Sequence, residues 1–72
     1  MNKVNGYTII AHRWSDSTKE SYIILAARQD DYSTYEYVTA DIQTLESNEW
    51  FWGHYFSGVG NLVNAITDFE ER

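Results

Sequence analysis

The sequence of 72 residues contains no cysteine and no proline. Without cysteine, disulfide bonds, a thiolate nucleophile and cysteine-based zinc sites are all excluded. The two histidines, His12 and His54, do not form a ligand spacing such as H-x-x-x-H. We therefore expect no metal site and no bound cofactor.

Catalytic motifs are lacking as well. No serine lies in a G-x-S-x-G context, whether at Ser15, Ser17, Ser21, Ser33, Ser47 or Ser57. Gly58 and Gly60 resemble half of a phosphate-binding loop, but no lysine follows them and an acidic chain repels phosphate. The sequence therefore predicts a protein without catalytic residues, which is not an enzyme.

Positive charge is scarce. Five basic residues face eleven acidic ones, which gives a net charge of −6. This balance argues against direct binding to nucleic acid or to an anionic membrane, and favours a basic protein surface or a nucleic-acid-binding protein as partner. Solubility alone also explains an acidic surface.

Long apolar runs are absent too. No stretch is long enough to span a membrane, and the N-terminal segment lacks a cleavable signal pattern because Arg13 follows a very short apolar run. We expect a cytoplasmic protein.

Aromatic residues make up 17% of the chain and must build the core of so short a domain. Residues 6–14, 21–29, 34–42 and 50–56 have the composition of strands, and helical periodicity follows Ser57. Residues 1–72 therefore predict a single α+β domain of order ββββα. We expect an antiparallel meander of three to four strands with one C-terminal helix packed on one face.

The first two predicted strands share the pattern Y-x-I-[IL]-A-x-R, at residues 7–13 and 22–28. Alternation places their Tyr, Ile, Ala and Arg positions on one face, and Ile10, Ile23 and Leu25 on the other. Both faces of the sheet are then apolar, and one helix covers only one of them. The second face needs tyrosines, loops or a partner, which includes a second copy in a homodimer.

The C-terminal helix is predicted to be amphipathic over about three turns, with Ser57 as its N-cap. Acidic residues at its C-terminal end oppose the helix dipole, and an Asp68–Arg72 pair relieves this only in part. The apolar stripe expected to face the sheet consists of Val59, Leu62, Val63, Ile66 and Phe69, and the residues expected mostly on the opposite side are Asn61, Asn64, Thr67 and Asp68.

The segment W-F-W-G-H-Y-F at residues 50–56 is the densest aromatic run. Strand alternation would place Trp50, Trp52, His54 and Phe56 on one face. We expect Trp52 and Phe56, or their alternates Phe51 and Tyr55, to be mostly structural. Gly53 indicates a bulge or a close backbone approach.

Five tyrosines form a predicted cluster surrounded by Asp30, Asp31, Glu36 and Asp41: Tyr32, Tyr35 and Tyr37, together with Tyr7 and Tyr22. Tyrosine is a favoured interface anchor, so we predict a protein interface formed by Tyr35, Tyr37, Asp30, Asp31 and Glu36. The alternative is an aromatic face that binds a small ligand or single-stranded nucleic acid, as stacking platforms do. Such platforms lie in basic grooves, which these acidic neighbours do not provide.

Three segments carry a resemblance: G-Y-x-I-I-A at residues 6–11, W-G-H-Y-F at 52–56 and D-F-E-E-R at 68–72. Together they resemble small uncharacterised proteins encoded by bacteriophages and prophages. The resemblance implies an origin, a size class and a location in the host cytoplasm, and assigns no site residues. Some small acidic phage proteins, anti-CRISPR proteins among them, mimic DNA or occlude host enzymes. The comparison with these proteins is an analogy that rests on size and charge. Eleven acidic residues in a sequence do not by themselves establish a spacing like that of DNA phosphates.

Overall fold

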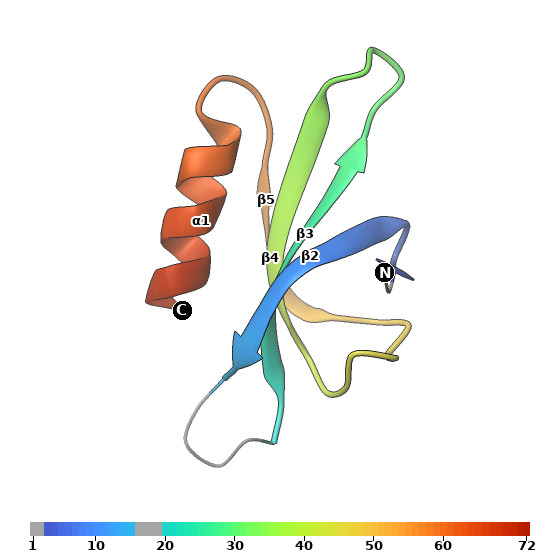
Figure 1. Ribbon diagram of the computed structural model, residues 1–72, viewed down its shortest axis with the longest axis vertical. Coiled ribbons are helices and arrows are strands. Elements are labelled where there is room, and N and C mark those ends of the chain that lie inside the picture. Colours follow the sequence, from blue (N-terminus) through green and yellow to red (C-terminus); the bar gives the residue numbers. More distant parts are fainter. Residues whose placement is uncertain (1–2, 16–19) are drawn as a thin grey trace.

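The computed structural model describes residues 3–15 and 20–72. These form one antiparallel sheet and one helix, and the strands lie in the sheet in chain order. Figure 1 shows a strongly curled sheet with the helix standing against one side. The predicted α+β meander with a C-terminal helix is therefore confirmed. The elements are β1 (Lys3–Val4), β2 (Tyr7–Trp14), β3 (Tyr22–Gln29), β4 (Tyr35–Ile42), β5 (Phe51–Phe56) and α1 (Asn61–Glu71).

A short first strand adds to the four that were predicted. β1 pairs with the start of β2 through Val4 opposite Tyr7. The two residues between them, Asn5 and Gly6, both have positive φ, at 51° and 84°. Two such residues form the tight hairpin turn whose twist suits antiparallel strands. A two-residue strand is too short to show any alternation in the sequence.

One face of the sheet carries the main hydrophobic core. Its central cross-strand pairs are Ile24 with Ala40 and Ala26 with Val38, and all four side chains are fully buried. Because the sheet curls, side chains outside the central strands close over this face. Those packed against the buried cluster are Tyr22, Leu45 and Trp50. Tyrosine and loop residues thus shield the face that the helix leaves open, as one of the sequence alternatives proposed.

The opposite face carries α1. Leu25 of β3 pairs with Thr39 of β4 on this side, and both are buried. The helix packs on β3, β4 and β5. Ala65 is the buried residue of α1, so a small side chain provides the close contact with the sheet.

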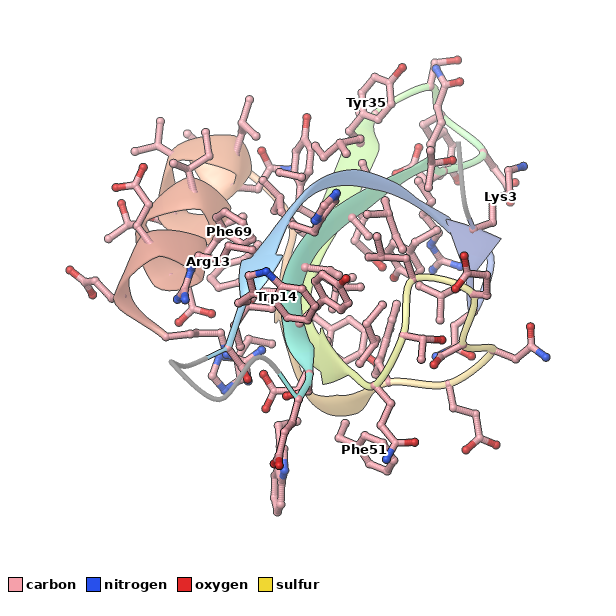
Figure 2. All side chains as sticks on the ribbon, turned by 60° about the horizontal axis from the view of Figure 1, so that its bottom comes forward. Lys3, Arg13, Trp14, Tyr35, Phe51 and Phe69 are labelled. Atoms are coloured by element: carbon pink, nitrogen blue, oxygen red, sulfur yellow. The ribbon has the colours of Figure 1, made fainter. Side chains whose placement is uncertain are left out.

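The roll of the helix differs from the prediction. Val63 is 68% exposed, and Leu62 and Ile66 are each 39% exposed, so the apolar stripe lies at the side and outward instead of against the sheet. On the side of the helix that faces the sheet, polar contacts join the helix to the strands. Arg13 of β2 donates to the carbonyl oxygen of Phe69 at 3.0 and 3.1 Å, and Figure 2 shows the two side chains together.

The start of the helix also differs. Gly60, not Ser57, is the N-cap, with a φ of 77° and no side-chain hydrogen bond to the first turn. At the other end, the backbone N–H of Arg72 donates to the carbonyl oxygen of Asp68, and the predicted pair between their side chains is present at 4.0 Å.

Two bulges break the predicted alternation. In β2 the register shifts between Ile9 and Ala11, which leaves Ile10 exposed. Tyr7 and Ile9 therefore face the main core, whereas Ala11 and Arg13 face the helix side. The Tyr, Ile, Ala and Arg positions of the shared pattern therefore share one face in β3 but not in β2.

The second bulge lies in β5, where the register shifts opposite residues 39–41. Trp50 packs on the core, but Trp52 has a φ of 58° and is 78% exposed. Phe51 and Tyr55 are exposed as well. The prediction of a mostly structural role is therefore wrong for Trp52, Phe51 and Tyr55, whereas Phe56 is partly buried. The bulge predicted at Gly53 is present, because Trp52 and Gly53 both lie opposite Ala40. A Cβ on Gly53 would lie 2.9 Å from Nε1 of Trp50.

Candidate functional site: a groove between the β3–β4 hairpin and the start of α1

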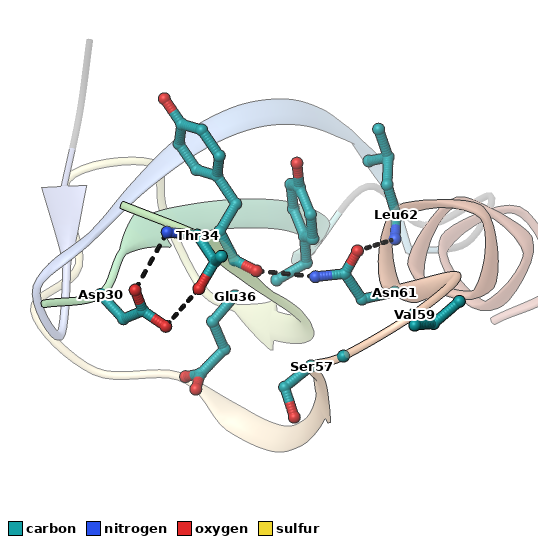
Figure 3. Close-up of a pocket in the computed structure, with 10 residues that line it drawn as sticks. Asp30, Thr34, Glu36, Ser57, Val59, Asn61 and Leu62 are labelled. Atoms are coloured by element: carbon teal, nitrogen blue, oxygen red, sulfur yellow. Dashed lines mark hydrogen bonds between the residues drawn. The ribbon is translucent and has the colours of Figure 1, made fainter. Parts of the chain in front are cut away.

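A groove of about 630 Å³ lies where the β3–β4 hairpin meets the segment that leads into α1. Figure 3 shows its walls. One wall comes from the hairpin and β4, the other from residues 57–62. Its lining residues are Asp30, Thr34, Tyr35, Glu36, Tyr37, Ser57, Gly58, Val59, Asn61 and Leu62. Four of the five predicted interface residues are thus brought together, and Asp31 is not among them.

Two tyrosines form the aromatic part of the groove. Tyr35 and Tyr37 are alternate residues of β4, so they share the helix-side face. Their rings stack with centroids 6.2 Å apart and an interplanar angle of 23°. Tyr35 is 53% exposed, which leaves one ring available as an anchor for a partner.

Asn61 fixes the distance between the two walls. Its Nδ2 donates to the carbonyl oxygen of Tyr35 at 2.7 Å, and its Oδ1 accepts from the backbone N–H of Leu62 at 2.7 Å. One side chain therefore joins β4 to the first turn of α1. The groove is pre-formed by this link, which lowers the entropy cost of binding.

Asp30 has a structural role at the rim of the groove. Its carboxylate accepts hydrogen bonds from the backbone N–H groups of Tyr32 at 2.8 Å and of Thr34 at 3.0 Å, and from the Thr34 hydroxyl at 2.5 Å. The Thr34 hydroxyl is the main cause of the lowered pKa of Asp30, followed by these backbone groups. The carboxylate closes the hairpin turn, and because its partners are neutral donors and it is exposed, it keeps its negative charge at the rim.

Glu36 forms an ion pair within the protein. It lies opposite Arg28 in the sheet, with 3.4 Å between Nη2 and Oε1, and the Tyr7 hydroxyl donates to the same Oε1. Burial of Tyr7, then its hydrogen bond to Glu36, raise the pKa of that phenol to about 12. Of the two acidic residues that line the groove, Glu36 is therefore paired with a cation, whereas Asp30 accepts hydrogen bonds from neutral groups.

The remaining predicted tyrosines do not join this site. Tyr32 lies in the turn and is 88% exposed. Tyr7 and Tyr22 pack on the main core, across the sheet from Tyr35 and Tyr37. An open platform formed by all five rings is therefore not present.

Sequence reasoning missed the apolar wall of the groove. Val59 and Leu62 were assigned to the buried face of the helix, but both are exposed and line the groove. The apolar stripe begins at Val59, between Gly58 and Gly60. These two glycines could have indicated that the helix does not begin at Ser57.

The histidines occupy ordinary polar and packing positions. Nδ1 of His54 lies 2.9 Å from Oδ2 of Asp68, and the His12 ring meets the Tyr22 ring edge-on at 5.5 Å. Among the residues that the structure describes, no group of three His, Cys, Asp or Glu side chains could hold a metal ion.

Charge is distributed unequally between the interior contacts and the surface. Three of the five basic residues, Arg13, Arg28 and Arg72, bind carbonyl oxygens or carboxylates of the protein itself. The exposed acidic residues are Glu20, Asp30, Asp31, Glu46, Glu49, Glu70 and Glu71. Of the basic residues that the structure describes, Lys3 and Arg28 are exposed, so acidic side chains outnumber basic ones on the described surface.

Comparisons of the chain with protein-family models, with curated proteins and with solved structures find no match. No relative therefore assigns a function to the groove. Within the described part of the chain, no helix is long and apolar enough to cross a membrane.

Proposed function

We propose that this protein acts by binding another protein, which inserts an apolar side chain into the groove and surrounds it with basic residues. The observation that carries the proposal is the apolar wall formed by Val59 and Leu62 opposite the stacked Tyr35. Exposed apolar side chains gathered around a concave site are typical of interaction surfaces.

Charge supports a basic partner. The net charge is −6, and the exposed acids leave a negative field around the groove, which attracts and orients a cationic surface. The groove itself supplies apolar contact through Val59 and Leu62, and the exposed carboxylate of Asp30 adds a negative charge at its rim. Binding of this kind would occlude the partner's basic surface, which agrees with the action expected from a likeness to small phage proteins.

Labelled synthetic peptides test the proposal. One set carries a central Leu, Phe or Trp flanked by Lys and Arg, and a second set carries the same anchors flanked by Asp and Glu. Fluorescence anisotropy measures their binding. We expect only the basic set to bind, and Tyr35→Ala to weaken binding about tenfold, as loss of an interface anchor does.

Tyr32→Ala is the matched control. Tyr32 is more exposed than Tyr35 and lies in the same hairpin, but it does not line the groove. Its replacement is expected to leave peptide binding unchanged. Equal effects of the two substitutions, or equal binding of acidic and basic peptides, would contradict the proposal.

A second candidate is the binding of a small apolar ligand. The volume of about 630 Å³ falls within the range of small-molecule sites. A ligand of this kind would shift the NMR signals of Leu62 and Tyr35 without any basic group. Single-stranded nucleic acid is less well supported, because Tyr7 and Tyr22 lie on the opposite face from the groove.

A further inference from the structure

The outward face of α1 carries an apolar pair with an acidic residue one turn beyond it. Val63 and Ile66 are three residues apart and Glu70 follows four residues later, so the three lie on one side of the helix. Val63 is the most exposed apolar residue within the helix. Spacings of three and four residues are those of a seam between two paired helices.

The charges at the two ends of α1 are complementary to one another. The first turn has no acidic residue and the N-cap Gly60 makes no side-chain hydrogen bond, while the last turn has no basic residue. Glu70 and Glu71 therefore stand at the negative end of the dipole, and the positive end has no anion. In an antiparallel pair, the acidic C-terminal end of each helix would lie beside the N-terminal end of the other, where the helix dipole is positive.

We propose that two copies of this chain pair antiparallel through the outward faces of α1. Val63 of each copy packs against Ile66 of the other, in the alternating layers of antiparallel helices. One turn further on, Glu70 of one copy then lies beside Val59 and Gly60 of the other, where the second helix begins. A parallel pair would instead place the acidic ends together.

The same pairing brings a carboxylate to each groove. Val59 lines the groove together with the exposed Asp30. Glu70 of the second copy would add a further negative charge at the rim, which strengthens the attraction for a basic partner. This last step rests on the proposed function, whereas the pairing itself does not.

The interface is small. A standard interface buries about 800 Å² per partner, roughly a sixth of the 4880 Å² of accessible surface, and one face of an eleven-residue helix provides less. We therefore expect reversible association, in which the weight-average mass rises from monomer to dimer with concentration.

Sedimentation equilibrium from about 1 to about 500 μM measures this rise. Val63→Asp is expected to remain a monomer throughout. Asn64→Asp, the same change in charge at the next residue but off the seam, is expected to dimerise like the unaltered chain. Circular dichroism verifies that both variants fold. A monomeric unaltered chain, or equal dimerisation of both variants, would overturn the proposal.

Cysteine pairing tests the antiparallel register, because the natural chain has no thiol. Val63→Cys and Ile66→Cys proteins are mixed in equal amounts and oxidised, and the products are separated by mass. The antiparallel layers predict that the mixed disulfide exceeds both self-linked products. A predominance of self-linked products would overturn the register.

Glu70 is tested against its neighbour. Glu70→Gln removes two symmetry-related contacts and is expected to weaken dimerisation about threefold to tenfold. Glu71→Gln removes the same charge but points away from the seam, so it is expected to leave dimerisation unchanged or slightly stronger. Equal weakening by the two variants would contradict the assigned position of Glu70.

The monomeric Val63→Asp protein separates this inference from the proposed function. If it binds the basic peptides about threefold or more weakly than the dimer does, Glu70 of the second copy contributes to the groove. If it binds them equally well, that contribution is refuted while the groove keeps its function. If neither form binds them, the proposed function fails and the dimer stands on the sedimentation and cysteine results.

Discussion

Oδ2 of Asp68 in α1 lies 2.9 Å from Nδ1 of His54 in β5. The hydroxyl of Thr39 in β4 donates to the same oxygen. Partial burial raises the pKa of Asp68, but the hydrogen bonds from Thr39 and His54 outweigh it and lower the pKa below its usual 3.8. The helix is thus held on the sheet by an ionised group with two partners from different strands.

The stability contributed by Asp68 depends on pH. Because the folded pKa is depressed, this contribution is present above the unfolded value of 3.8 and is lost as the pH falls through the lower folded value. We expect Asp68→Asn to lower the free energy of unfolding near neutral pH by about 2 kcal/mol. Urea unfolding at a series of pH values would show the loss, together with a weaker decrease in stability below pH 3.8 than in the unaltered protein.

Glu71→Gln provides the control for Asp68. Glu71 is exposed on the same helix, and its replacement removes the same charge without removing these bonds. Its stability is expected to stay within about 0.5 kcal/mol of the natural value. If both variants lost the same stability, general charge and not the Asp68 contacts would be responsible.

Tyr7 predicts a second pH dependence, on the alkaline side. Its folded pKa of about 12 exceeds the ordinary 10.0, so the folded state keeps a proton that the unfolded chain loses. Stability is complete below pH 10.0 and decreases as the pH rises towards 12. We expect Tyr7→Phe to lose about 1 kcal/mol at neutral pH but to show a weaker alkaline decrease.

Ultraviolet titration of the phenols checks this assignment. Tyr7→Phe is expected to remove the phenol that ionises last, whereas Tyr35→Phe, which keeps Tyr7, is expected to leave the late-ionising fraction in place. An unchanged late-ionising fraction in the Tyr7→Phe protein would show that another tyrosine carries the raised pKa.

The fold class was predictable because four segments have the composition of strands and one has helical spacing. The bounds of β2 to β5 fall within one residue of the expected ranges. The helix, in contrast, begins later than Ser57. Tyr35 and Tyr37 line the groove, but their role in an interface stays a prediction.

The faces of the elements were harder to predict, because they depend on partners distant in the sequence. Asp68 is polar and was assigned to the outside of the helix, yet it turns inward to Thr39, which is 29 residues away. That contact rolls α1 and exposes Val63. The bulges at Ile10 and Trp52 likewise reverse alternation; Gly53 indicated the second of them, but no glycine or proline marks the first.

Gly53 is expected to tolerate no side chain. A Cβ at this position would lie 2.9 Å from Nε1 of Trp50, whose ring packs edge-on against Tyr7 at 5.3 Å. We expect Gly53→Ala to lower the free energy of unfolding by about 1–3 kcal/mol, the usual cost of overpacking. Thermal and urea unfolding measure it.

A double variant isolates this clash. Trp50→Leu shortens the obstructing side chain, so Gly53→Ala is expected to cost at least about 1 kcal/mol less in the Trp50→Leu background than in the natural protein. Equal costs in the two backgrounds would show that Trp50 is not the group that excludes a side chain at this position.

Trp52 is the residue for which structure and sequence disagree most. Its φ of 58° is unfavourable for a bulky side chain, most of the ring is exposed, and Arg72 binds its backbone carbonyl oxygen, not its ring. Asparagine tolerates this conformation and keeps the carbonyl, so Trp52→Asn is expected to raise the free energy of unfolding by about 0.5–1 kcal/mol. The same change two residues earlier, Trp50→Asn, removes a ring packed on the core and is expected to cost about 3 kcal/mol. A loss of more than about 1 kcal/mol in Trp52→Asn would instead mean that this ring supports the fold, as strand alternation alone predicts.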